Sequence, residues 1–317
     1  MRQVLRAPWF GPLLAVVAVY ALFALLAPDT FPRSANVLTM ARQTVVVAIA
    51  AVGMTLVMIQ GGIDLSVGST VALTTVIVAQ ALDGGAGPWS AAASGVALGA
   101  CVGAINGLLV SGLGLVPFIV TLGTMSALRG AAKGLANEQK VDADPKGLDG
   151  LMSLPGGAHG GLLLPTGVWI ALGLAIAFAA FVAFTRAGRH VVAVGSNVQT
   201  ARLCGVPVGR VTVMVYVMAG ALAGLAGVME FSTLTVGDPT DSIGLELEVI
   251  AAVVIGGGSL AGGRGSIAGA LLGAVLLTEI KTGSTHVGLP NWVQEILTGA
   301  IILVAMGLDR LREKRKV

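Results

Sequence analysis

One acidic residue lies between two long apolar stretches of this 317-residue chain, in the segment Gln60–Ser69 (QGGIDLSVGS). A charged side chain at the centre of a membrane helix costs roughly 2.5–3.5 kcal/mol, so Asp64 is typical of a functional or water-lined position. The neighbouring glycines would let a helix break and present backbone groups to a polar solute. Alternatively, the segment is a short turn in which Asp64 caps the next helix through Ser66. The sequence leaves both interpretations open.

A second glycine-rich segment, Ile255–Ser266 (IGGGSLAGGRGS), resembles the first in its surroundings. Each ends an apolar stretch and is followed by another that is rich in small residues. Paired glycine interruptions in the two halves of a chain indicate the central site of a transporter. Asp64 has no acidic counterpart in the second segment, and both segments could equally be tight turns between helices.

A basic loop is the third informative feature, from Arg186 to Arg210. Its residues 198–203 are amphipathic, Asn197 is a suitable N-cap, and Gly205 before Pro207 is a helix stop signal. We expect a short helix that lies along the membrane surface and docks to a soluble partner. The alternative is an interfacial helix whose arginines bind anionic lipid headgroups.

The composition indicates which elements hold these segments. Hydrophobic residues make up 55% of the chain, charged residues 11%, and the mean hydropathy is +0.90. A soluble domain carries about 25% charged residues. Glycine occurs 46 times, which is typical of membrane helices that pack through small residues. We therefore predict an all-α bundle of transmembrane helices, some broken at glycine.

The apolar stretches predict about ten spans. They cover about 12–27, 44–60, a third ending near 82, 90–110, 116–132, 165–185, 211–231, 248–260, 267–280 and 292–308. A polar segment, 133–164, interrupts the series. The first stretch could be a signal peptide, but the many spans that follow favour an uncleaved helix.

The basic residues predict the orientation. Of 19 Lys and Arg residues, seven (33, 42, 129, 133, 140, 146 and 281) would lie outside if the amino terminus were cytoplasmic, which leaves twelve inside. This positive-inside bias predicts that both termini are cytoplasmic. Segment 133–164 is then periplasmic and loop 186–210 cytoplasmic, within a single permease domain over residues 1–317.

Enzyme motifs are missing from the sequence. No Gly-Lys dipeptide occurs, so the chain has no phosphate-binding Walker loop, and no H-E-x-x-H pair is present. His159, His190 and His286 all fall in predicted loops. Cys101 and Cys204 indicate neither a disulfide nor a metal site. A protease built on Ser259 and His286 is disfavoured, because a serine in a glycine-rich turn is usually structural. We expect no enzymatic activity, cofactor or metal.

Three motifs resemble the permease family of ABC importers for ribose, xylose, arabinose and related monosaccharides: Gly61–Ser69, Pro117–Met125 and Gly262–Ser266. The resemblance extends from about Asn36 to Arg312. It implies that two such subunits form a sugar pathway in the bacterial inner membrane. An ATP-binding subunit would lie on the cytoplasmic side and a periplasmic sugar-binding protein on the other.

The resemblance also implies site residues. For the translocation pathway these are Gly61, Gly62, Asp64, Ser66, Gly68, Ser69, Thr121, Gly257, Gly258 and Ser259. For coupling to the ATPase they are Gly195, Asn197, Ala201, Arg202, Gly205 and Pro207. The chain departs from the family in its longer, more acidic segment after Gly134, in Gly258 where a hydroxyl residue is common, and in Gln199–Thr200.

An ion-coupled secondary transporter of a small polar solute is the alternative. Such a protein needs titratable residues within the membrane that carry ions, and Asp64, Glu230 and Glu279 are the candidates. The sequence identifies neither the sugar nor whether the second permease subunit is another copy of this chain or a homologue.

Overall fold

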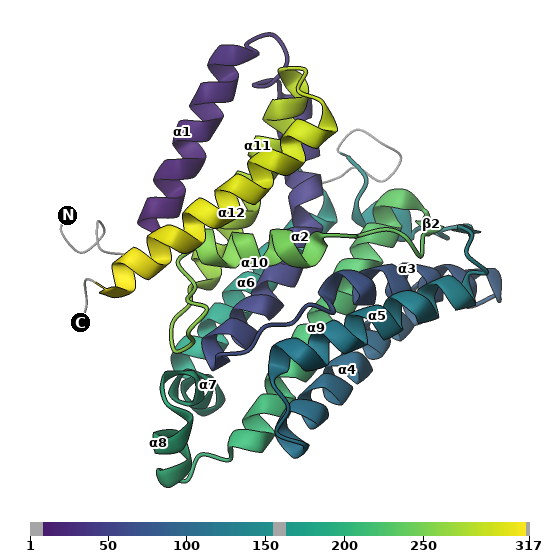
Figure 1. Ribbon diagram of the computed structural model, residues 1–317. Helices are drawn as coiled ribbons and strands as arrows, with labels where there is room; N and C mark the ends of the chain where they lie inside the picture. Colours follow the sequence, from purple (N-terminus) through teal and green to yellow (C-terminus); the bar gives the residue numbers. More distant parts are fainter. Residues whose placement is uncertain (1–8, 155–162, 315–317) are drawn as a thin grey trace.

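The computed structural model describes residues 9–154 and 163–314 (Figure 1). These residues form twelve α-helices, a 3₁₀ helix and one short two-stranded sheet. The predicted all-α helical architecture is confirmed.

The helices follow the apolar stretches of the sequence. Their bounds are α1 Phe10–Leu26, α2 Ser34–Gln60, α3 Val67–Asp83, α4 Pro88–Gly112, α5 Pro117–Leu135, α6 Thr166–Phe184, α7 Arg186–Ser196, α8 Val198–Leu203, α9 Val208–Leu234, α10 Leu245–Ile255, α11 Ile267–His286 and α12 Asn291–Lys314. The 3₁₀ helix η2 covers Leu148–Leu151. Strands β1 (Val141–Asp142) and β2 (Val236–Gly237) pair antiparallel, with Val141 opposite Gly237.

Five of the described helices are long and apolar enough to cross a membrane: α2, α4, α6, α9 and α11. Helix α2 has 27 residues and is therefore about 40 Å long, more than the roughly 30 Å hydrocarbon core of a bilayer. Helix α10 has 11 residues, about 16 Å, too short to cross the core alone. The chain has the helices of a multi-pass membrane protein, while the count of ten spans stays a prediction.

Several predicted boundaries are wrong. Helix α2 begins at Ser34, ten residues before the predicted start, because the polar pair Arg42–Gln43 lies within the helix. Helix α11 continues to His286, so Lys281 is helical. His190 lies in α7, which was predicted as loop. His159 lies outside the described residues. For α2 and α11, polar residues within the helix were interpreted as the end of a span.

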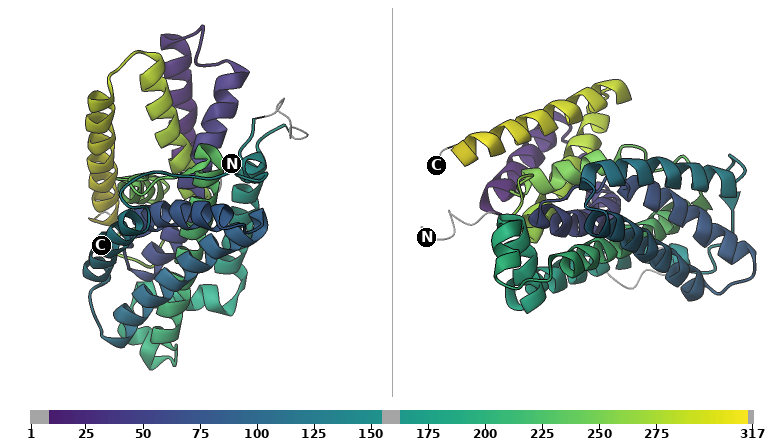
Figure 2. Two further views of the ribbon diagram at one scale, coloured as in Figure 1. Left: turned by 90° about the vertical axis from the view of Figure 1, so that its right-hand side faces the viewer. Right: turned by 60° about the horizontal axis from the view of Figure 1, so that its bottom comes forward.

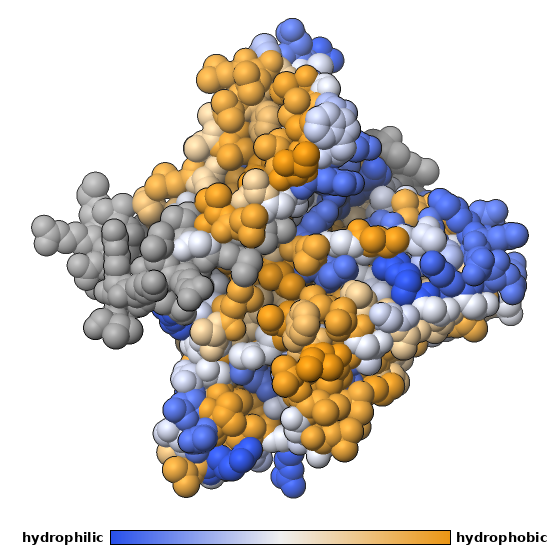
Figure 3. All heavy atoms as spheres, in the orientation of Figure 1, coloured by the Kyte–Doolittle hydropathy of each residue, from blue (hydrophilic) through white to orange (hydrophobic). Residues whose placement is uncertain are grey.

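Helix α2 forms the centre of the bundle. All its residues from Thr44 to Ile59 are buried, and α2 contacts α6, α7, α9, α10 and α11. Helices α1, α2, α11 and α12 group on one side, and α3, α4 and α5 on the other (Figures 1 and 2). Hydrophobic residues cover much of the helix surface in the view of Figure 3. An apolar exterior around a buried central helix is what a lipid-embedded bundle requires.

Helices α4 and α9 pack closely along an extensive contact, through glycines on both sides. A Cβ at Gly99 would overlap the carbonyl oxygen of Gly220, and one at Gly220 would overlap that of Gly99. Small residues allow such backbone contact, which is a main source of helix association in lipid. Glycine is therefore required here for packing.

We predict that Gly99→Ala destabilises the protein by about 1–3 kcal/mol, the usual cost of overpacking. Gly112→Ala in the same helix is the control, since nothing lies within 4 Å of its added Cβ and alanine favours a helix over glycine. Thermal unfolding of the detergent-solubilised protein measures both. Equal melting temperatures for the two variants would contradict the proposed packing.

Candidate functional site

The two glycine-rich segments meet at one end of α2. The Gly263 N–H donates to the carbonyl oxygen of Ile59 at 2.7 Å, and Gly262 lies against the backbone of Gly61. Gly195 of α7 packs on the same Ile59 carbonyl, with no space for a side chain. We call this contact of Ile59, Gly61, Gly195, Gly262 and Gly263 the glycine junction. The junction joins Gly195, a predicted coupling residue, to both glycine-rich segments.

Each glycine-rich segment begins with the same kind of helix end. After α2, the Gly61 and Gly62 N–H groups donate to the carbonyls of Met58 and Val57. After α10, the Gly257 and Gly258 N–H groups donate to Val254 and Val253 in the same pattern. This is the Schellman motif, which needs a left-handed residue. Gly61 and Gly257 supply it, with φ of +90° and +88°.

Asp64 lies in a buried polar cluster between the helix breaks. Its Oδ1 accepts hydrogen bonds from the Ser66 N–H at 2.8 Å and the Ser66 hydroxyl at 2.6 Å. The Asn106 amide of α4 donates to the Ser66 hydroxyl at 3.0 Å. The Thr121 hydroxyl of α5 lies 3.1 Å from the Ile63 carbonyl oxygen and donates to it. Asp64 and Ser66 are 3% and 1% exposed, and their hydrogen bonds form a turn just before α3, whose N-cap is Ser66 without a side-chain capping bond.

The other predicted pathway residues lie in two places. Gly68 packs against the Glu246 carboxylate and the Ser242 carbonyl. Ser69 lines a cavity of about 460 Å³ together with Arg129 and Glu246. Ser259, by contrast, is buried in the turn after α10, with 1% of its surface exposed. The structure therefore groups the residues near Asp64 and, separately, the turn at Gly257–Ser259.

The loop after α6 contains the predicted short helix. Helix α8 covers Val198–Leu203, and the Asn197 Oδ1 accepts the Thr200 N–H at 2.8 Å. Gly205 ends the helix with φ of +80°, before Pro207. The N-cap, the helix and its stop signal are all confirmed.

Helix α8 has one face against the protein and another in solvent. Ala201 is 4% exposed and packs in a cluster with residues of α2, α7 and α9. Leu203 is 89% exposed beside the exposed Arg202. We did not identify Leu203 from the sequence, although its exposed apolar side chain is suited to a contact with another protein.

The far ends of α5 and α9 are joined by a different set of contacts. The Lys140 ammonium forms an ion pair with Asp238 at 3.0 Å, next to the β1–β2 pair. Partial burial alone would raise the pKa of Asp238. Hydrogen bonds from Thr240 and Lys140 outweigh it and hold that pKa below its ordinary value. The segment after α5 is thus fixed to the loop before α10.

We predict that Asp64→Ala destabilises the protein by about 1–3 kcal/mol, because the Ser66 N–H loses its buried acceptor. Asp64→Asn keeps an acceptor oxygen at the same position, so it should reduce the stability of the protein clearly less. Thermal unfolding in detergent compares the two. If Asp64→Asn and Asp64→Ala are equally stable but both abolish transport, the carboxylate is needed for transport and does not stabilise the turn before α3.

Comparison with known proteins identifies the family. A family described as "branched-chain amino acid transport system / permease component" matches residues 36–306. The ribose import permease protein RbsC of Escherichia coli (strain K12) is 38% identical over 304 residues, covering 95% of this chain and 93% of the relative.

Two further relatives extend the comparison. The L-arabinose ABC transporter permease protein AraH of Azospirillum brasilense is 32% identical, over 96% of this chain and 88% of AraH. The autoinducer 2 import system permease protein LsrC of Klebsiella pneumoniae subsp. pneumoniae is 36% identical, over 99% of this chain and 90% of LsrC. No solved structure matches. The chain therefore belongs to this family of transport-system permease components, as its resemblance to monosaccharide importers predicted.

Proposed function

We propose that this chain is the transmembrane permease subunit of a bacterial ABC importer for monosaccharides, located in the inner membrane. The observation that carries the proposal is 38% identity to a ribose import permease over 95% of the chain. The arabinose and autoinducer 2 permeases cover the chain to a similar extent. Two permease subunits, identical or homologous, would form the pathway.

The proposed orientation places α7 and α8 in the cytoplasm. Gly195 packs against the end of α2 and the turn after α10, and Gly209 lies near Ser111 at the end of α4. The connections that follow α2, α4, α6 and α10 therefore gather at one end. Arg186, Arg189, Arg202 and Arg210 belong to the same end, which agrees with the positive-inside rule. Segment 133–164 is then periplasmic, where a sugar-binding protein would dock.

We propose that α8 docks to an ATP-binding subunit. Leu203 and Arg202 form the exposed contact, and Asn197 and Gly205 fix the ends of the helix. Ala201 attaches α8 to the bundle, Pro207 begins α9, and Gly195 carries movement to the glycine junction. Because the backbone of Ile59 and Gly263 lies against Gly195, a displacement of α7 toward them would move one or both.

The glycine-rich segments would form the moving part of the pathway. Gly61, Gly62, Gly257, Gly258 and Ser259 belong to turns that end α2 and α10, at the end where α8 docks. Asp64, Ser66, Gly68, Ser69 and Thr121 hold the start of α3 against α4 and α5. ATP binding would close the ATPase subunits, move α8 and rock the two permease subunits, releasing sugar inward. ATP hydrolysis belongs to the partner, since this chain has no Walker loop.

Reconstitution in proteoliposomes with the ATPase subunits and the binding protein tests the proposal. We predict that uptake of ribose or arabinose requires ATP inside the vesicle. Dissipation of proton and sodium gradients should not reduce it. Uptake driven by an ion gradient without ATPase subunits would establish the secondary transporter instead.

We predict that Leu203→Asp prevents assembly with the ATPase and abolishes ATP-dependent uptake, because it places a carboxylate in an apolar contact. Leu203→Met keeps the apolar surface and is the matched control. Co-purification and uptake are measured on the same preparations. If Leu203→Asp still assembles and transports, α8 is not the docking element.

A further inference from the structure

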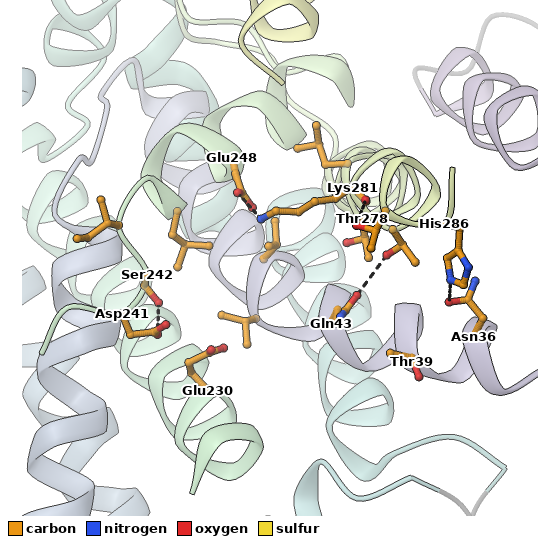
Figure 4. Close-up of a pocket in the computed structure, with 17 residues that line it drawn as sticks. Asn36, Thr39, Gln43, Glu230, Asp241, Ser242, Glu248, Thr278, Lys281 and His286 are labelled. Atoms are coloured by element: carbon orange, nitrogen blue, oxygen red, sulfur yellow. Dashed lines mark hydrogen bonds and ion pairs between the residues drawn. The ribbon is translucent and has the colours of Figure 1, made fainter. Parts of the chain in front are cut away.

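A polar cavity lies away from α8, between α2, α9, α10 and α11. Its volume is about 610 Å³, within the usual 300–1,000 Å³ of small-molecule sites. Helix α2 contributes Asn36, Thr39, Gln43, Val46 and Val47, which share one face of the helix. Figure 4 shows side chains from all four helices around this space.

The cavity contains an unusual density of charge for a membrane protein. The lining includes the carboxylates of Glu230, Asp241 and Glu248 and the ammonium of Lys281, so its formal charge is −3 + 1 = −2. Lys281 pairs with Glu248 at 2.8 Å. In the described part of the chain, no side chain or backbone N–H donates to the Glu230 carboxylate, which lies between Asp241 and Gln43 in Figure 4.

These groups cannot face lipid. Ionisable side chains at membrane depth face the bundle interior or a water-filled cavity, because their transfer into hydrocarbon is costly. Figure 3 shows hydrophilic residues gathered in a recess beside α11, between more hydrophobic surfaces. The cavity must therefore contain water or a polar solute.

The cavity is closed toward α8. On α2 its lining stops at Val46 and Val47, and on α11 it stops at Leu277. From there to Ile59, α2 is buried in the core. In the proposed orientation, a solute could enter from the periplasmic end and would stop at this apolar floor.

The lining also indicates what kind of solute fits. Glu230 and Asp241 accept hydrogen bonds from hydroxyl groups, whereas Lys281 and Asn36 can donate to them. The net negative charge disfavours phosphates and carboxylates. No Trp, Tyr or Phe is among the described lining residues, so the site lacks the aromatic surface on which a sugar ring would stack. Binding should accordingly be weak.

We propose that this cavity is a low-affinity site for a neutral polyhydroxylated solute at the outer end of the pathway, with Glu230 as its main hydrogen-bond acceptor. The proposal rests on the importer function and locates a specific sugar contact within it. The residues that sequence reasoning assigned to the pathway do not line this cavity.

Cysteine accessibility in the assembled importer tests this site. Thr39→Cys lines the cavity, and Ala41→Cys on the opposite side of α2 lines a separate, mostly apolar pocket. Both are made with Cys101→Ser and Cys204→Ser. A membrane-impermeant thiol reagent should modify Thr39→Cys and spare Ala41→Cys. Ribose at about twice its dissociation constant should slow the reaction about threefold by mass action, whereas ribose 5-phosphate should not.

Glu230→Gln should weaken protection by ribose about tenfold or more, since it replaces one acceptor oxygen of the carboxylate with an amide donor. Asp83→Asn, at an exposed carboxylate at the end of α3, should leave protection unchanged. Failure of the reagent to modify Thr39→Cys, or modification that ribose never slows, would overturn the site. ATP-dependent uptake by the same preparations keeps that failure distinct from a failure of the importer function.

Discussion

The hydrogen bond from the Gly263 N–H to the Ile59 carbonyl is the contact on which the rest of the structure depends. A helix that ends inside a membrane protein leaves carbonyl groups unpaired, and hydrocarbon offers no water to satisfy them. At the ends of α2 and α10, some of these carbonyl groups accept hydrogen bonds within Schellman turns. The Ile59 carbonyl of α2 also accepts the N–H of Gly263, which follows α10. Because Gly195 packs on the same carbonyl, α7 contacts both the end of α2 and the turn that follows α10.

The sequence predicted those features of the fold that are determined by residues close together in the chain. It did not predict those that depend on contacts between distant helices. Helix α8 was correct to the residue, since Asn197, Gly205 and Pro207 fix its ends by interactions within a few residues. Helix α7 was missed because its glycines and arginines are typical of a loop. In the structure Thr185 caps it by accepting the Gly188 N–H, and Val191 and Val194 are buried. The start of α2 was missed because the polar pair Arg42–Gln43 lies within the helix, where Gln43 accepts a hydrogen bond from the Thr282 hydroxyl of α11.

The buried cluster at Asp64 and the cavity at Glu230 are two different environments for a carboxylate at membrane depth. Asp64 accepts hydrogen bonds from the Ser66 N–H and hydroxyl in the turn that precedes α3. Glu230 is partly buried and lines the cavity, with no such donor among the described residues. Sequence reasoning favoured Asp64 because its surrounding motif is distinctive. Glu230 lies near the end of an ordinary apolar helix, and only the packing of four helices places its carboxylate in a cavity.

Weak binding in that cavity is consistent with transport powered by a partner. If a binding protein captures the sugar, the permease gains nothing from a second tight site, because tight binding in the pathway slows release. A lining of carboxylates, amides and hydroxyls without an aromatic side chain offers a sugar many exchangeable hydrogen bonds. No single position in the cavity then binds the sugar tightly. The apolar floor at Val46, Val47 and Leu277 then supplies the barrier. Opening that floor requires α2 and α11 to shift, and α2 ends at the glycine junction that α7 contacts directly. Helix α2 therefore runs without a break from the lining of the cavity to the glycine junction, where it contacts α7.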